Sequence, residues 1–146
     1  MKSKIQSVEA DFFVHATEDS RKVVKAVEEL LGSDRAPAEE KLDGHFGNAI
    51  FSMRLHLTGE EAERGVKRIF ASLPRRQKDV IAADMEKFVD EHSALFLRFD
   101  KQLLVLGRLA LGGGDSLRVK VKPRKFQMKS GGPEFFRRLL EESSAV

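Results

Sequence analysis

Residues 50–57 read IFSMRLHL, and this stretch is the clearest strand of the chain. Apolar residues at positions 51, 53, 55 and 57 alternate with polar ones, which is the period of a strand with one buried and one solvated face. Thr58 and Glu61 follow with the spacing of a capping box. The sequence here predicts a strand that leads directly into a helix, whose apolar stripe is formed by Ala62, Val66, Ile69 and Phe70.

Upstream of this stretch, the pattern predicts another strand and another helix. Residues 4–14 alternate in the same way and place four apolar side chains on one face, namely Val8, Ala10, Phe12 and Val14. A helix follows, with Thr17 as its expected N-cap and Gly32 as its C-terminal stop. Residues 33–44 are polar and contain Pro37, so we expect a loop there.

Downstream, Pro74 fits the first position of a third helix. Residues 94–99 and 102–111 then resemble two strands that turn near Asp100 and Lys101. Three glycines lead into a further strand, and residues 133–142 have the pattern of a final helix. Consecutive strands near the end of the chain favour an α+β two-layer sandwich, with a mostly antiparallel sheet and helices on one face.

The composition bounds the function. The chain has 146 residues and 41% hydrophobic residues, which suits one domain over residues 1–146. The absence of cysteine excludes disulfides, thiolate nucleophiles and Cys-ligated metal sites. No apolar run approaches the roughly 20 residues of a membrane span, and no signal-peptide core follows Lys2 and Lys4. We therefore expect a cytoplasmic protein.

Positive charge gathers in the second half of the chain. Residues 117–129 read LRVKVKPRKFQMK, in which Arg118, Lys120 and Lys122 alternate with apolar residues, and Arg124 and Lys125 extend the run. A strand that fixes cations in a row on one face suits a polyanion, and nucleic acid is the obvious candidate. The alternative is a solvated sheet face or an edge strand protected by lysine.

A second group of cations runs from Arg64 to Lys78 without an intervening acid. Arg75 and Arg76 come in the first helical turn after Pro74, where the helix dipole disfavours positive charge. Contact with an anionic partner would offset that local cost. The alternative is that these arginines pair with neighbouring acids, of which Glu60, Glu61 and Asp79 are the candidates.

Two further segments carry polar groups of open role. The loop Gly44-His45-Phe46-Gly47-Asn48 either exposes backbone amides and Asn48 to a phosphate or is a tight turn that requires glycine. His15 precedes Thr17, Glu18 and Asp19. It either binds a metal or acts as a general base, or it forms a hydrogen bond near the start of a helix. No histidine pair has metal-ligand spacing, and no nucleotide-binding or catalytic fingerprint is present, so we expect no metal site and no cofactor.

Four segments together resemble a known family: HATED at 15–19, GHFGNAI at 44–50, LRFDKQ at 97–102 and RVKVKP at 118–123. Their order and content are similar to an archaeal family described as predicted RNA-binding proteins or predicted exosome subunits. The fold of that family resembles ribosomal protein L five of the large subunit. The chain departs from the family pattern at Ala49, where proline is usual, and at Leu103 and Leu104, where small residues are usual. Residues 128–146 lie outside the resemblance and are expected to form a C-terminal helical extension.

The residues and the resemblance together predict a non-catalytic RNA-binding protein. RNA, single-stranded or structured, is the expected partner, and the resemblance adds exosome or ribosomal components. The expected RNA-contacting residues are Arg118, Lys120, Lys122, Arg124, Lys125, Arg75, Arg76, His45, Phe46, Asn48, Arg98 and Lys101. One alternative is a metal-dependent, nuclease-like hydrolase that uses His15, Asp19 and Asp100. Another is a protein-interaction module in an RNA-processing complex.

Overall fold

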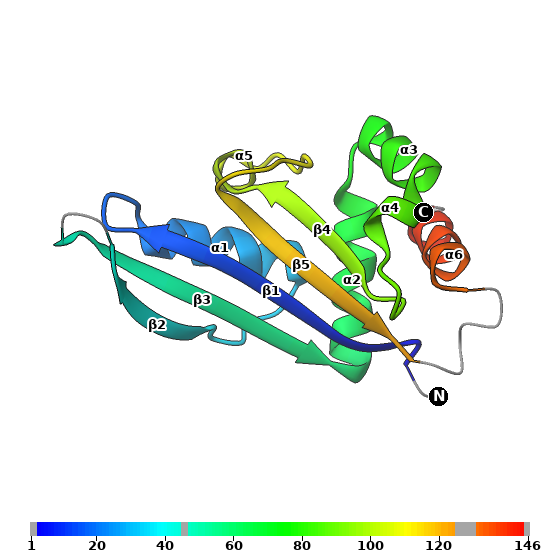
Figure 1. Cartoon of the computed structure of the whole chain (residues 1–146), viewed down its shortest axis with the longest axis horizontal. Helices are drawn as coiled ribbons and strands as arrows, with labels where there is room; N and C mark the ends of the chain where they lie inside the picture. Colours follow the sequence, from blue (N-terminus) through cyan, green and yellow to red (C-terminus); the bar gives the residue numbers. More distant parts are fainter. Residues whose placement is uncertain (1–2, 45–46, 125–130, 145–146) are drawn as a thin grey trace.

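Six helices and five strands make up the parts of the chain that the computed structural model describes, which are residues 3–44, 47–124 and 131–144 (Figure 1). In chain order they are β1 (Ile5–His15), α1 (Ser20–Leu31), β2 (Ala38–Asp43), β3 (Ala49–Thr58), α2 (Gly59–Ser72), α3 (Arg75–Ala83), α4 (Met85–Phe88), β4 (Leu95–Asp100), α5 (Lys101–Val105), β5 (Ser116–Pro123) and α6 (Gly132–Ser144).

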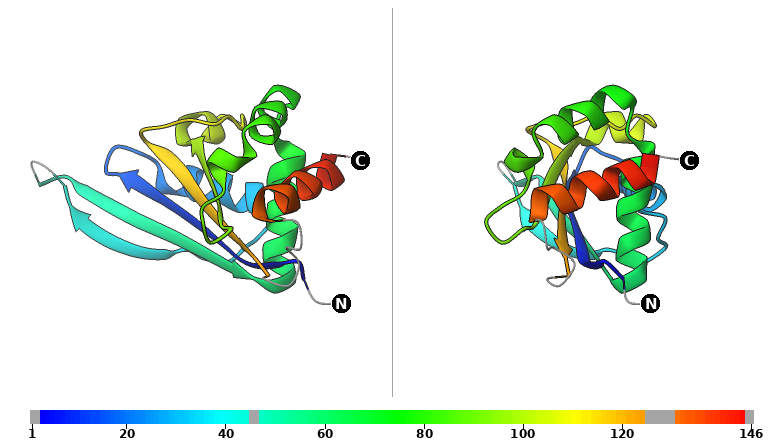
Figure 2. Two further views of the ribbon diagram at one scale, coloured as in Figure 1. Left: turned by 45° about the vertical axis from the view of Figure 1, so that its right-hand side comes forward. Right: turned by 90° about the vertical axis from the view of Figure 1, so that its right-hand side faces the viewer.

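The five strands form one sheet with the order β2-β3-β1-β5-β4, and each neighbouring pair is antiparallel. Helices α1 and α2 lie behind the sheet in Figure 1, and the turned views of Figure 2 show the helices gathered on that side. The predicted class, an α+β sandwich with an antiparallel sheet, is confirmed. The likeness to ribosomal protein L five stays a prediction.

The core lies between the sheet and the helices, and the alternation of the strands builds it. In β1 the four apolar residues that the pattern assigned to one face are at most 1% exposed. Leu117, Val119 and Val121 of β5 continue this buried layer beside them. The inner faces of α1 and α2 close the core from the other side, with Val23, Val27, Leu31, Val66, Ile69 and Phe70. Burial of these side chains is the main source of stability.

Two segments differ from the sequence-based expectation. Residues 38–43, expected as a loop, form the edge strand β2, which pairs with β3 and is exposed throughout. Residues 102–111, expected as a strand, begin instead with the short helix α5, because the Asp100 side chain caps it by accepting a hydrogen bond from the amide of Leu103 at 2.9 Å. The apolar run that follows Asp100 had no alternation, so its period could not separate strand from helix.

The helices begin within a few residues of the positions expected from the sequence, but the hydrogen bonds that cap them differ from the expectation. Asp19, rather than Thr17, caps α1 by accepting a hydrogen bond from the amide of Arg21. Gly32 ends that helix with φ of 66°, as predicted. Thr58 occupies the N-cap position of α2, but its side chain forms no capping bond, so the expected capping box is absent there.

The C-terminal helix α6 is packed into the helical layer. Phe136, Leu139 and Leu140 are at most 2% exposed and join the main hydrophobic core. Helices α2, α3 and α4 contact α6. The expected C-terminal helix over residues 133–142 is therefore present, and it buries an apolar face. None of the described helices is long and apolar enough to cross a membrane.

Candidate nucleic-acid interface

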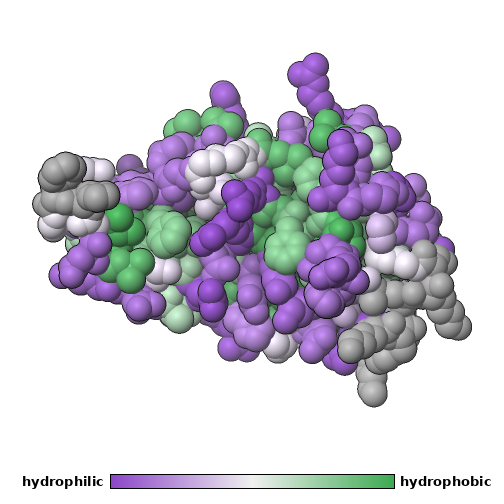
Figure 3. Space-filling view, in the orientation of Figure 1, coloured by the Kyte–Doolittle hydropathy of each residue, from purple (hydrophilic) through white to green (hydrophobic). Residues whose placement is uncertain are grey.

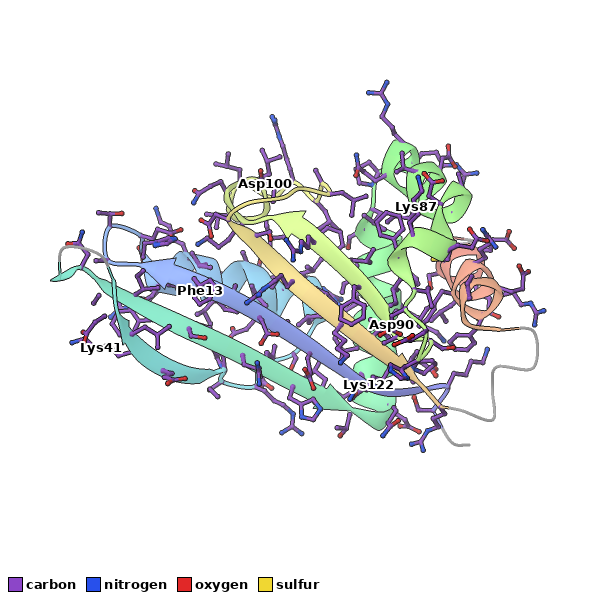
Figure 4. The ribbon with its side chains drawn as sticks, viewed as in Figure 1. Phe13, Lys41, Lys87, Asp90, Asp100 and Lys122 are labelled. Atoms are coloured by element: carbon purple, nitrogen blue, oxygen red, sulfur yellow. The ribbon has the colours of Figure 1, made fainter. Side chains whose placement is uncertain are left out.

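The sheet has one face that the helices do not cover, and we call it the open face (Figures 1 and 2). Outward side chains align across the strands in rows that the register defines. One row contains Arg54 of β3, Asp11 of β1, Arg118 of β5 and Arg98 of β4. The next row along contains His56, Glu9, Lys120 and Phe96 on the same four strands. Figure 4 views this face and labels Phe13 on β1 and Lys122 on β5.

Cations on β4 and β5 are concentrated on this face. Arg98, Arg118 and Lys122 are exposed, and Lys120 is half-buried. None of these four forms an ion pair with a carboxylate among the residues that the structure describes. Basic residues elsewhere do so, including Lys4, Arg35, Arg54, Lys67, Arg75 and Arg137. The unpaired cations of β4 and β5 are therefore available to an external anion.

Acids on β1 limit the positive area. Asp11 lies between Arg54 and Arg118 in the register, and its Oδ1 accepts a hydrogen bond from Arg54 Nε at 2.6 Å. That bond holds the pKa of Arg54 above its ordinary value. Glu9 lies opposite Lys120 in the next row. The positive surface is accordingly centred on β4 and β5, with β1 and β3 forming a mixed border.

A shallow depression of about 370 Å³ lies over β4 and β5 within this surface. Its polar lining is Asp11, Arg98, Arg118 and Lys120, and Phe96 forms part of its apolar lining. Phe96 was missed by the sequence reading. The available signal was its position in LFLRFD, where it shares the outward parity of Arg98 rather than the inward parity of Leu95, Leu97 and Phe99.

Lys101 is not a surface cation. Its side chain is 0% exposed, and Nζ lies 2.8 Å from Glu18 Oε1 and 2.9 Å from Asp115 Oδ2. Nζ also donates a hydrogen bond to the carbonyl oxygen of Phe13. The expected role of Lys101 in contacting RNA therefore needs correction, because a buried ammonium that already has three acceptors cannot reach a phosphate.

The same cluster bears on the metal-dependent alternative. Ligand-capable atoms of His15, Glu18 and Asp115 lie within 4.8 Å of one another. The Lys101 ammonium already pairs with both carboxylates and supplies the positive charge that a metal ion would bring. Burial by itself raises the pKa of Glu18, but the hydrogen bonds from Lys101 and from the His15 amide outweigh it and lower that pKa. The cluster is therefore an ion network that joins the segment between β1 and α1, helix α5 and the residue before β5.

The other acids of that alternative have structural partners. Asp19 caps α1 and Asp100 caps α5. Gln102 donates a hydrogen bond to Glu18 Oε2 at 3.1 Å. Each polar residue of the Asp100-Lys101-Gln102 segment is therefore used in an internal contact, which is a sufficient physical reason for their presence.

Gly44 and Asn48 lie between the end of β2 and the start of β3. The amide of Gly44 donates to the carbonyl oxygen of Asn48 at 2.8 Å, and a Cβ on Gly44 would meet that oxygen at 2.6 Å. Gly47 has φ of 75°, which glycine adopts without strain. These are the features of the tight turn. Asn48 is exposed and lines a hollow of about 370 Å³ with His15 and Thr17 at the same end of the sheet.

Two further expected contacts, Arg75 and Arg76, fall outside the open face. Arg75 and Arg76 lie on α3, which packs against α4 and α6 in the helical layer. Arg75 pairs with Asp79 at 3.3 Å, as the alternative reading expected. Arg124 follows β5 directly and is half-buried. Three expected residues, His45, Phe46 and Lys125, lie outside the described residues.

Comparisons with known proteins find a matching family model and several archaeal relatives. A family model described as RNA binding matches residues 7–123. The chain is 29% identical over 124 residues to RNA-binding protein PAB1135 of Pyrococcus abyssi, and the alignment covers 80% of each chain. It is 30% identical over 122 residues to the uncharacterized protein MJ0213 of Methanocaldococcus jannaschii, and the alignment covers 77% of this chain and 80% of that one. The chain is also 31% identical to protein AF2318 from Archaeglobus fulgidus, of the family model DUF54. The crystal structure of that protein matches with a TM-score of 0.75, and the match covers 93% of this chain and 99% of that one.

Proposed function

The chain belongs to the family described as RNA binding, and from this premise we propose that it binds RNA on the open face of its sheet without catalysing a reaction on it. One observation carries the proposal. Arg98, Arg118, Lys120 and Lys122 gather on the face that helices leave uncovered, and none of them pairs with a described carboxylate. The name of the Pyrococcus abyssi relative, an RNA-binding protein, supports the same partner.

The spacing of these cations suits a charged backbone. Successive outward residues of a strand are about 7 Å apart, and the neighbouring strand adds a second row about 5 Å away. Arg118, Lys120 and Lys122 thus present a line of charge along β5, and Arg98 widens it onto β4. Contacts of this kind hold an RNA by its phosphates and fix its position, and they carry little sequence information.

Binding to RNA should respond to a charge deletion on this face. The triple variant Arg118→Ala, Lys120→Ala, Lys122→Ala removes three phosphate contacts from exposed or half-buried positions, so the fold should persist. Its affinity for RNA should fall, and the slope of log K against log salt should flatten by about 2, at about 0.7 per contact with a single strand.

A matched control separates a specific face from net charge alone. Lys22 and Lys25 on α1 and Arg64 on α2 are also exposed, and their replacement by alanine removes the same three charges from the helical layer. This control variant should keep most of its affinity and its salt slope. Equal losses in the two triple variants would reject the open face as the binding surface.

The metal-dependent hydrolase is the second candidate, since His15, Glu18 and Asp115 could form a ligand set. The occupied Lys101 network argues against it. Incubation of labelled RNA with the protein and Mg²⁺ or Mn²⁺ tests it, and cleavage that disappears in His15→Ala would contradict the non-catalytic proposal.

Association with the exosome or with ribosomal components rests on the family resemblance. Capture of those components by the wild-type protein, but not by the charge-deleted open-face variant, would support a link through bound RNA. Capture that survives both the variant and ribonuclease treatment would instead support the protein-interaction module.

A further inference from the structure

Two phenylalanines point outward from the open face, where a polar residue would be the usual choice. Phe96 of β4 is 43% exposed, and Phe13 of β1 is half-buried with the outward parity of Glu9 and Asp11. Figure 3 shows hydrophobic side chains set among hydrophilic ones on this face. Aromatic residues are common in strands, but two of them on one uncovered sheet face form an apolar surface for a partner.

Each of these rings lies beside a cation of β5. The Arg118 guanidinium carbon is 5.4 Å from the centroid of the Phe13 ring, and Lys120 Nζ is 5.3 Å from the centroid of the Phe96 ring. A ring offers a flat surface to a nucleobase, and the neighbouring cation offers a charge to the adjoining phosphate. A guanidinium plane can itself stack on a base.

Between the rings, Arg98 and Arg118 are direct partners in the register of β4 and β5. Like charges directly opposite each other destabilise a sheet, and an anion between them would relieve that repulsion. Both arginines line the depression, together with Phe96 and Lys120. The depression therefore combines one apolar ring with three cations, whereas Asp11 at its β1 border is held by Arg54.

We propose that this depression binds single-stranded RNA, with one base stacked on Phe96 and an adjoining phosphate held by Arg98 and Arg118. The inference rests on the proposed function and deepens it. The Lys120 ammonium, on its flexible stem, moves from the ring to a phosphate when the base arrives. Paired bases in a duplex keep their faces inside the stack, so only an unpaired base can use the ring.

Phe13 provides a second platform for the same strand of RNA. It lies two strands from Phe96 and four residues along the sheet, which places the backbone positions of the two residues roughly 17 Å apart for ordinary strand spacing and rise. The two rings therefore receive bases that are separated by other nucleotides of one RNA strand. The arginine pair lies between them and holds the intervening backbone.

Fluorescence anisotropy with a short oligouridylate tests the role of the ring. Phe96→Ala should weaken binding of the single strand by at least about fivefold, which is the lower range for loss of one stacked base. The salt slope should stay at the wild-type value because no phosphate contact is removed. Phe96→Tyr should restore affinity. Val80→Ala is the matched control, since Val80 is 44% exposed but lies on α3 in the helical layer.

An abasic oligonucleotide of the same length isolates the stacking contact. Wild-type protein should bind it more weakly than the oligouridylate, and Phe96→Ala should add no further loss. Two results together would overturn the inference and leave RNA binding intact. Phe96→Ala would bind the oligouridylate as tightly as the wild type does, and the wild type would bind single-stranded and duplex RNA equally well. Failure of the wild type to bind any RNA would overturn the proposed function as well.

Discussion

Replacement of the buried Lys101 by methionine should destabilise the protein strongly. The change shortens the side chain by one heavy atom, keeps an unbranched apolar stem and removes the charge. It leaves Glu18 and Asp115 without their shared cation, and these side chains are 15% and 39% exposed. Removing one partner of a buried ion pair costs about 3–5 kcal/mol. Because water can reach both carboxylates in part, we expect the lower end, about 3 kcal/mol.

That loss is measurable by thermal and urea unfolding followed by circular dichroism. For a chain of this length, about 3 kcal/mol corresponds to a fall in Tm of roughly 6–12 °C. The double variant Lys101→Met, Glu18→Gln should recover part of the loss, since a neutral amide no longer needs the ammonium. RNA affinity of folded Lys101→Met should equal that of the wild type. A free energy of unfolding within about 0.5 kcal/mol of wild type would refute the ion-network account.

Three further outcomes follow from single contacts. The pKa of Glu18 is lower in the folded state than in the unfolded state. The ionised carboxylate therefore stabilises the fold above about pH 4.3, and this stabilisation is lost as the pH falls through the folded-state pKa. The difference in Tm between the wild type and Glu18→Gln should accordingly become smaller as the pH falls below about 4.3. Phe136→Ala empties a fully buried site of α6 and should cost about 3–5 kcal/mol in urea unfolding, whereas a cost below about 1 kcal/mol would contradict the packing of that helix. Gly32→Ala forces a Cβ into φ of 66° and to 2.4 Å from Arg68 Cδ, so it should cost at least about 1 kcal/mol, and an unchanged Tm would show that the helix end rearranges freely.

The alternating strands were the most predictable part of the fold. In β1 from Val8 and in β3 from Met53, the inward residues are apolar at every second position, and burial follows that period. Strand β2 was missed because its sequence, AEEKLD, has only two apolar residues, Ala38 and Leu42, and all six of its residues are exposed. An edge strand exposed on both sides has no hydrophobic period to detect, and its only signal is the pairing with β3.

The open face was predictable in part. The cations of β5 were identified from their alternation with apolar residues, Arg98 was named among the expected contacts, and the structure places them together. The role of Lys101 was not predictable, because its burial depends on Glu18 and Asp115, which lie far from it along the chain. Charged residues are usually exposed, so a buried lysine is recognised only when its partners are located.

Ultraviolet cross-linking of a bound oligouridylate, followed by mass spectrometry of the protein peptides, tests the central claim most directly. It reports which face of the protein contacts RNA without any substitution. We predict cross-links within residues 95–100 and 116–123, which form β4 and β5 and carry the unpaired cations and Phe96. Cross-links confined to α1, α2 and α3 would contradict the account, because they would place the RNA on the helical layer.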